Sequence, residues 1–264
     1  MDASFLPAIG VGALIGLVLG ATGGGGSLLA IPLLVYVVGV EPRAAAAMSL
    51  VVVGGSAFVG VYHRRASGEI KVKAALVFSG VGAAGAWGGA FGHRFMRSET
   101  VLLLFGLLML LAVWQMWRRG IDLPAHAPHD GCAERFPRSC WIKVAGVGLL
   151  AGVLTGFFGV GGGFVIVPAL ALLLGFPARM AVSTSLLIIA LVSVGGLVGY
   201  LQADRIDWPL AGIVLLGGAF GMTVGSWIAQ RASPVILMRS FVAVAVVVAI
   251  VLIVHNGVRL YSGA

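Results

Sequence analysis

Ten long apolar segments fill most of the sequence, and charged residues or prolines separate them. The third, fourth, fifth and eighth to tenth approach the ~20 residues that a helix needs to cross a bilayer. Only 10% of the residues are charged, whereas a soluble domain carries about 25%. We therefore expect an all-α polytopic membrane protein that lies in the lipid bilayer. The segments span 5–22, 27–40, 44–62, 74–93, 100–117, 141–158, 163–175, 180–201, 209–229 and 234–254.

A glycine-rich stretch occurs twice, 136 residues apart. The first copy reads GLVLGATGGGGSLLAIP from Gly16 to Pro32, and the second reads GVLTGFFGVGGGFVIVP from Gly152 to Pro168. At this offset about a quarter of the positions are identical over the first five segments, where composition alone would give roughly a tenth. The chain therefore repeats one unit twice.

The predicted repeats occupy 1–118 and 141–264, and a loop at 119–140 joins them. Each repeat holds five segments, an odd number, so the two repeats should insert with opposite orientations. In each, a glycine-broken helix pair precedes three spanning helices. The fold class is thus two inverted-topology repeats with about 8–10 membrane segments, depending on whether the short glycine-flanked segments cross completely.

Loop charge predicts the orientation. Twelve of the 17 Lys and Arg residues fall on the side that carries the 119–140 loop, and basic loops remain in the cytoplasm. Both termini should then lie on the extracytoplasmic side of the inner membrane. Cys132 and Cys140, in the cytoplasmic loop, should be reduced thiols. The net charge of +8 is interpreted as orienting charge, and no nucleic-acid partner is expected.

The two glycine clusters are the candidate functional feature. Broken helices in inverted repeats are typical of secondary transporters, whose substrates bind near the midplane. The N-terminus of the half-helix after each cluster carries a partial positive charge, which favours an anion. Ser27 adds a hydroxyl in the first copy, where the second has Gly163. Tight helix packing is the alternative explanation, because Gly16 and Gly20 have GxxxG spacing.

Hydroxyl residues inside the matched helices extend this site. Each hydroxyl bonds either to a carbonyl of its own helix or to substrate. Arg43 and Arg179 begin matched helices, as snorkelling interface residues or as a gating funnel for anions. The predicted substrate-binding residues are Gly23, Gly24, Gly25, Gly26, Ser27, Ser49, Gly159, Gly161, Gly162, Gly163, Thr184 and Ser185.

The acidic residues and histidines, His93 included, all lie in predicted loops or at segment ends. Coupled carriers usually bury a carboxylate at membrane depth, so the sequence shows no coupling relay. An anion that leaves a negative interior gains ~2.3 kcal/mol per charge per 100 mV, which suffices for uncoupled export. No enzyme motif, metal-ligand spacing or cofactor site is recognisable, so we expect a protein that is not an enzyme and needs no cofactor.

These motifs resemble those of the sulfite exporter TauE/SafE family of membrane transporters. The carrying features are GATGGGGSLLAIPLL, its echo GFFGVGGGFVIVPAL, and the AAMSL and VSTSL segments. The resemblance extends from about residue 8 to 254. It implies about eight spanning segments and export of sulfite, sulfonates or related sulfur anions. The family motif corresponds to Gly23–Gly26 and Gly159–Gly163 in this chain.

The sequence therefore predicts an anion transporter of the cell inner membrane that exports a small sulfur-containing anion by alternating access. An anion channel, an importer and a non-transporting membrane scaffold or assembly factor remain as alternatives. The identity of the anion, the coupling ion and the oligomeric state are left open.

Overall fold

The computed structural model describes residues 5–65, 68–93, 95–118, 138–173, 175–201, 206–231 and 246–254. All regular secondary structure in these residues is helical. Four of the helices are long and apolar enough to cross a membrane: Pro42–Arg64, Val72–His93, Arg179–Tyr200 and Trp208–Ala229. The expectation of an all-α polytopic membrane protein is thereby confirmed at the level of secondary structure and hydropathy.

The helices follow the apolar segments closely. In chain order they are α1 (Phe5–Thr22), α2 (Gly26–Tyr36), α3 (Pro42–Arg64), α4 (Val72–His93), α5 (Ser98–Arg118), α6 (Arg138–Phe158), α7 (Gly163–Leu173), α8 (Ala178–Leu201) and α9 (Trp208–Arg231). A further helical stretch covers 246–254.

Two predicted ranges differ from the structure or lie partly outside the described residues. α6 begins at Arg138, so the last three residues of the predicted 119–140 loop belong to a helix. Residues 119–137, which include Cys132, lie outside the described residues, as does the first part of the predicted 234–254 segment.

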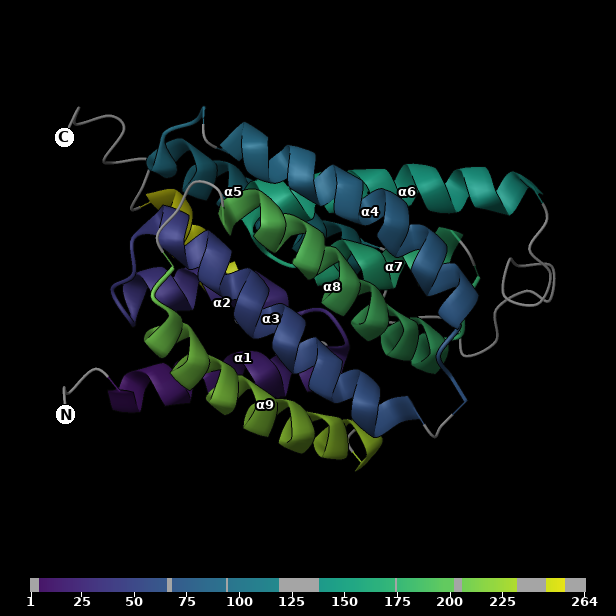
Figure 1. The fold of residues 1–264 in the computed structure, drawn as a ribbon, viewed down its shortest axis with the longest axis horizontal. Helices are drawn as coiled ribbons and strands as arrows, with labels where there is room; N and C mark the ends of the chain where they lie inside the picture. The colour runs from purple at the N-terminus through teal and green to yellow at the C-terminus, as the bar shows by residue number, and fades with distance from the viewer. Residues whose placement is uncertain are drawn as a thin grey trace.

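Helices at matched positions of the two halves make matched contacts. α1 packs along α9 and α4 packs along α6, while α3 and α8 cross at the centre of the molecule between these pairs (Figure 1). α3 also contacts α9, and α8 contacts α4. Each flanking pair therefore contains one helix from each half, so the two halves interlock instead of forming separate lobes.

The matched central helices run in opposite directions. On α3, Gly54 faces Ser193 of α8, and further along α3, Gly60 faces Leu186. In the opposite sense, Gly196 near the end of α8 faces Leu50 in the first half of α3. Residue numbers thus rise along one helix as they fall along the other. By the same contacts α1 runs parallel to α9, because Gly12 faces Val214 and Gly20 faces Met222.

Glycines at four-residue spacing allow these flanking pairs to approach closely. A Cβ atom built on Gly20 would lie 2.6 Å from the carbonyl oxygen of Met222. In the other pair, Gly152 and Gly156 of α6 lie against the backbones of Gly82 and Ala86 in α4. The GxxxG glycines therefore serve helix packing, which is the common role of small residues between membrane helices. The glycines that follow them in the sequence lie instead at the breaks between helices.

We predict that Gly152→Ala destabilises the protein, because the new methyl group overlaps the backbone of α4. Overpacking of this kind costs typically 1–3 kcal/mol. The matched control is Gly146→Ala on the same helix, where a Cβ meets no atom within 4 Å and alanine favours the helix by up to about 1 kcal/mol. Thermal unfolding of both variants in detergent, followed by size exclusion, compares them. Equal melting temperatures would contradict the close α4–α6 seam.

Candidate substrate site at the two glycine breaks

Glycine ends the first helix of each half at the same position of the repeat. Gly23 follows α1 with a φ of 75°, and Gly159 follows α6 with a φ of 69°. Side chains disfavour this left-handed conformation, which commonly terminates helices at glycine. The chain then starts the 11-residue helices α2 and α7. At 1.5 Å per residue each is about 16 Å long, near half of the ~30 Å hydrocarbon core, so both are half-helices.

The two breaks meet each other. A Cβ atom on Gly163, the first residue of α7, would lie 2.6 Å from the Cα atom of Gly24, two residues before α2. Bare backbone of one half thus touches bare backbone of the other, and the N-termini of two half-helices converge there. Helix N-termini carry a partial positive charge. The glycines of both breaks are buried: Gly23, Gly24, Gly25, Gly26, Gly159, Gly161, Gly162 and Gly163.

Two matched serines tie each break to the opposite half. Ser185 of α8 donates to the Gly23 carbonyl oxygen at 2.7 Å, and Ser49 of α3 donates to the Gly159 carbonyl oxygen. Both side chains are fully buried. Each hydroxyl also lies near the carbonyl oxygen three residues earlier in its own helix, at 2.8 and 2.9 Å. The sequence left open whether each hydroxyl bonds to a carbonyl of its own helix or to substrate. In the structure each hydroxyl has a carbonyl of its own helix as a partner, and also a carbonyl of the opposite break.

Further hydroxyls stabilise the first break internally. Thr22 Oγ1 accepts from the Gly25 N–H at 2.8 Å and donates to the Val18 carbonyl oxygen. Ser27 Oγ donates to the Gly24 carbonyl oxygen at 2.7 Å. These bonds supply partners for backbone that has left the helix, which the interior of a membrane protein requires.

The remaining predicted site residues are Thr184, whose hydroxyl has partners outside the breaks, and two exposed arginines. Thr184 is buried, but its Oγ1 accepts from the Lys71 N–H at 3.1 Å, in the segment between α3 and α4. Arg43 and Arg179 are exposed in the first turns of α3 and α8. Because these helices are antiparallel, the two arginines stand at opposite ends of the molecule.

Arg64 and Tyr200, at matched positions, were not singled out by the sequence motifs. Arg64 Nη2 donates to the Gly20 carbonyl oxygen at 3.3 Å, and the Tyr200 hydroxyl donates to the Gly156 carbonyl oxygen at 2.9 Å. Both acceptor carbonyl groups, those of Gly20 and Gly156, lie in the last helical turn before a glycine break. Arg64 closes an apolar segment beside a second arginine, so the sequence pattern by itself predicts only loop charge at this position. Alignment of the two repeats places Arg64 opposite Tyr200, and this difference between two matched polar residues is the signal that could have identified both.

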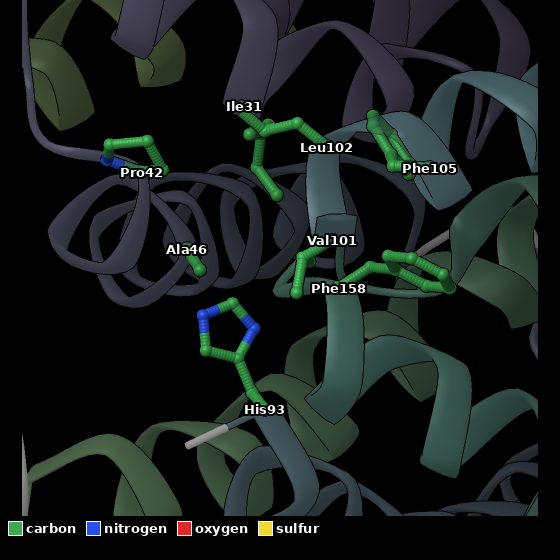
Figure 2. A pocket seen from close by; sticks show the side chains of 8 residues that line it. All are labelled: Ile31, Pro42, Ala46, His93, Val101, Leu102, Phe105 and Phe158. Atoms are coloured by element: carbon green, nitrogen blue, oxygen red, sulfur yellow. The ribbon is translucent and has the colours of Figure 1, made fainter. Parts of the chain in front are cut away.

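A small hollow reaches the second break from the Pro42 end of α3. Figure 2 shows the His93 imidazole pointing into it, toward Ala46 and Val101. Ala46 in turn contacts Gly159, so the hollow ends beside the glycine backbone. Its lining is mostly apolar and consists of Ile31, Pro42, Ala46, His93, Val101, Leu102, Phe105 and Phe158.

His93 differs from its sequence interpretation as an end-of-segment residue. It is the last residue of α4, but its side chain is only 2% exposed, because α6 and α8 cover it. Its Nδ1 lies 2.8 Å from the Phe157 carbonyl oxygen, and its ring packs edge-on against Tyr200. Within the described residues, no three His, Cys, Asp or Glu side chains form a group that could hold a metal ion.

Comparison with known proteins places this arrangement in a family. The profile described as sulfite exporter TauE/SafE matches residues 8–252. A probable membrane transporter protein of Xylella fastidiosa (strain 9a5c) is 38% identical over 253 residues, which cover 95% of both chains. The probable membrane transporter protein YunE of Bacillus subtilis (strain 168) is 28% identical, with 86% of this chain and 89% of the relative covered. No solved structure gives a significant match.

The family profile spans both glycine breaks and the helices that hold them. The relatives are similar over nearly the whole chain and are named as membrane transporters. The chain therefore belongs to the sulfite exporter TauE/SafE family and is a multi-pass membrane transporter, as its glycine motifs led us to expect.

Proposed function

We propose that the protein is a secondary transporter that exports a small sulfur-containing anion, such as sulfite or a sulfonate, by alternating access. The observation that carries this proposal is the contact between Gly24 and Gly163. It brings the N-termini of two half-helices together inside the protein, where the low dielectric strengthens their attraction for an anion. The choice of sulfur among anions follows from the family alone.

The substrate would bind where the backbone is bare. Glycines let a solute approach the main chain closely, and the dipoles of α2 and α7 both point their positive ends at this point. Ser49 and Ser185 donate hydrogen bonds to the carbonyl oxygens of Gly159 and Gly23, which flank this bare backbone. Export down the membrane potential needs no coupling ion, because an anion gains free energy when it leaves a negative interior.

Antiparallel α3 and α8 support the proposal that the repeats have inverted topologies. In that arrangement the end with Arg179 faces the cytoplasm, because the basic loops gather there, and the end with Arg43 faces outward. The hollow beside His93 then opens on the outer side of the second break, while side chains cover the first break on the inner side.

The packing also indicates which bodies would move. Close backbone contacts tie α1 to α9 and α4 to α6, and such seams resist separation. The rigid bodies are then these mixed pairs, each with helices from both repeats, instead of one sequence repeat rocking against the other. The central helices α3 and α8 lie between them and carry the serines that hold both breaks.

Sulfite efflux from proteoliposomes of purified protein tests the function. The vesicles are loaded with sulfite, and potassium with valinomycin sets the potential. We expect saturable efflux that accelerates when the potential is inside-negative. Unsaturable flux that is orders of magnitude faster would indicate a channel. Absence of any anion flux from folded protein would refute the transporter mechanism proposed here.

Removal of the cross-repeat hydroxyls tests the site. In Ser49→Ala and Ser185→Ala, a buried carbonyl of each break loses a donor, which costs about 1–3 kcal/mol, so we expect efflux to fall about tenfold or more. The matched controls are Ser56→Ala on α3 and Ser193→Ala on α8. Both serines are buried, and among the described residues their hydroxyls have no hydrogen-bond partner. Equal efflux for the four variants would remove the serines from the site.

Single-cysteine labelling tests the orientation. With Cys132 and Cys140 replaced by serine, Arg43→Cys should react with an impermeant maleimide in intact cells, because Arg43 is exposed on the proposed outer face. Arg179→Cys should react only after the membrane is permeabilised. The reverse pattern would invert the proposed orientation, and labelling of both from outside would contradict antiparallel insertion.

A further inference from the structure

The cytoplasmic side of the first break carries a cluster of charged and hydroxyl side chains that the glycine motifs do not predict. Arg64 ends α3, and its Nη1 lies 3.4 Å from Ser183 Oγ of α8. Ser183 Oγ donates to Glu69 Oε2 at 2.9 Å. Ser183 is fully buried, and the side chains of Arg64 and Glu69 are half-buried. The cluster therefore joins α3, α8 and residues 68–71, which precede α4.

The cluster lies directly beside the glycine break. The second guanidinium nitrogen of Arg64 donates to the Gly20 carbonyl oxygen, in the last turn of α1. Ser183 lies two residues before Ser185, whose hydroxyl holds the Gly23 carbonyl oxygen. An anion on Arg64 would thus lie beside the last turn of α1, which ends at the first break.

The other half lacks this chemistry at the matched positions. Arg64 corresponds to Tyr200, and Ser183 corresponds to Ala47. The hollow at that end is mostly apolar, with His93 as its ionisable lining residue. A cation with an adjacent hydroxyl therefore exists at only one of the two breaks in the described residues, on the side proposed to load the substrate.

Glu69 holds the place that an oxyanion would take. Carboxylates and oxyanions present similar pairs of oxygen atoms, and the planar guanidinium group binds either. Because a partly buried guanidinium needs a negative partner, the charge of Glu69 compensates that of Arg64 while residues 68–71 lie against α8. The Lys71 N–H and the Glu69 carbonyl oxygen fix this segment on Thr184. If these residues moved away, Arg64 would require another anion.

Resting on the transport function proposed above, we infer that Arg64 and Ser183 form the cytoplasmic loading site for the oxyanion and that the Glu69 carboxylate is its built-in competitor. The substrate binds by displacing Glu69 from Ser183 and from the neighbourhood of Arg64. Exposed Arg179 adds a second positive charge on α8, four residues before Ser183. Residues 68–71 move away as the substrate anion replaces the Glu69 carboxylate beside Arg64. Access from the cytoplasm is thereby linked to the presence of substrate.

Sulfite uptake into everted membrane vesicles tests this site, because the cytoplasmic face there meets the added sulfite. Glu69→Gln keeps the size and polarity of the side chain but removes its charge. We expect the KM for sulfite to fall at least about threefold, since a neutral amide competes less well for the guanidinium group. An unchanged or higher KM overturns the inference.

A double variant separates a binding role from a structural one. If Arg64 only balances the charge of Glu69, then Arg64→Gln combined with Glu69→Gln should transport as well as Glu69→Gln alone. If Arg64 binds the anion, initial uptake at sub-saturating sulfite should be at least about tenfold lower in the double variant. The control is Arg65→Gln, which removes a neighbouring exposed arginine that stacks on Tyr62 and should leave uptake unchanged.

The outcomes distinguish this inference from the function on which it rests. Wild-type vesicles that take up no more sulfite than vesicles without the protein would refute the proposed substrate and this site together. Wild-type uptake with an unaltered KM in Glu69→Gln, or with a fully active double variant, would overturn the loading site alone. Size-exclusion profiles confirm that each variant is folded, and the Glu69→Gln comparison stands without the double variant.

Discussion

The structure depends on one requirement: backbone polar groups inside a membrane must find partners within the protein. Two helices are broken near the centre of the molecule, so the breaks must be enclosed and supplied with hydrogen bonds. The enclosure comes from α3 and α8, whose Ser49 and Ser185 donate to the breaks of the opposite half. Side chains of Thr22 and Ser27 supply the first break from within. Bare backbone can therefore be enclosed within the helix bundle, at the place where we propose that the anion binds.

Close packing of the flanking helices follows from the same glycine-rich composition but uses different glycines. Gly16, Gly20, Gly152 and Gly156 lie on seams where Cβ atoms would overlap a neighbouring backbone. Each seam joins helices from different repeats, so the repeats could not separate without breaking it. In the proposed cycle the pairs α1–α9 and α4–α6 would therefore be the rigid units. α3 packs on the first pair and α8 on the second, and these two central helices contact each other between the pairs.

The two halves differ at corresponding ends of their matched helices. One end carries Arg64, Glu69, Ser183 and Thr184, with hydrogen bonds that link α8 to the segment before α4. The other end carries an apolar hollow beside Tyr200 and His93. In the proposed transport cycle, these unequal side chains would give the two ends of the molecule different affinities for an anion. Direction in such a scaffold would be set by these few positions.

The sequence by itself determined the membrane class, the family, the duplication and the bounds of most helices, because hydrophobicity, glycine clusters and helix-ending residues act locally. It also indicated the half-helices, whose lengths the structure fixes at 11 residues. Only the tertiary structure decided which glycines pack helices and which touch each other, as Gly24 and Gly163 do. It alone showed the buried position of His93 and the half-buried position of Arg64, which the linear pattern had placed at segment ends. These features depend on contacts between residues far apart in the chain, and a single sequence carries no record of such contacts.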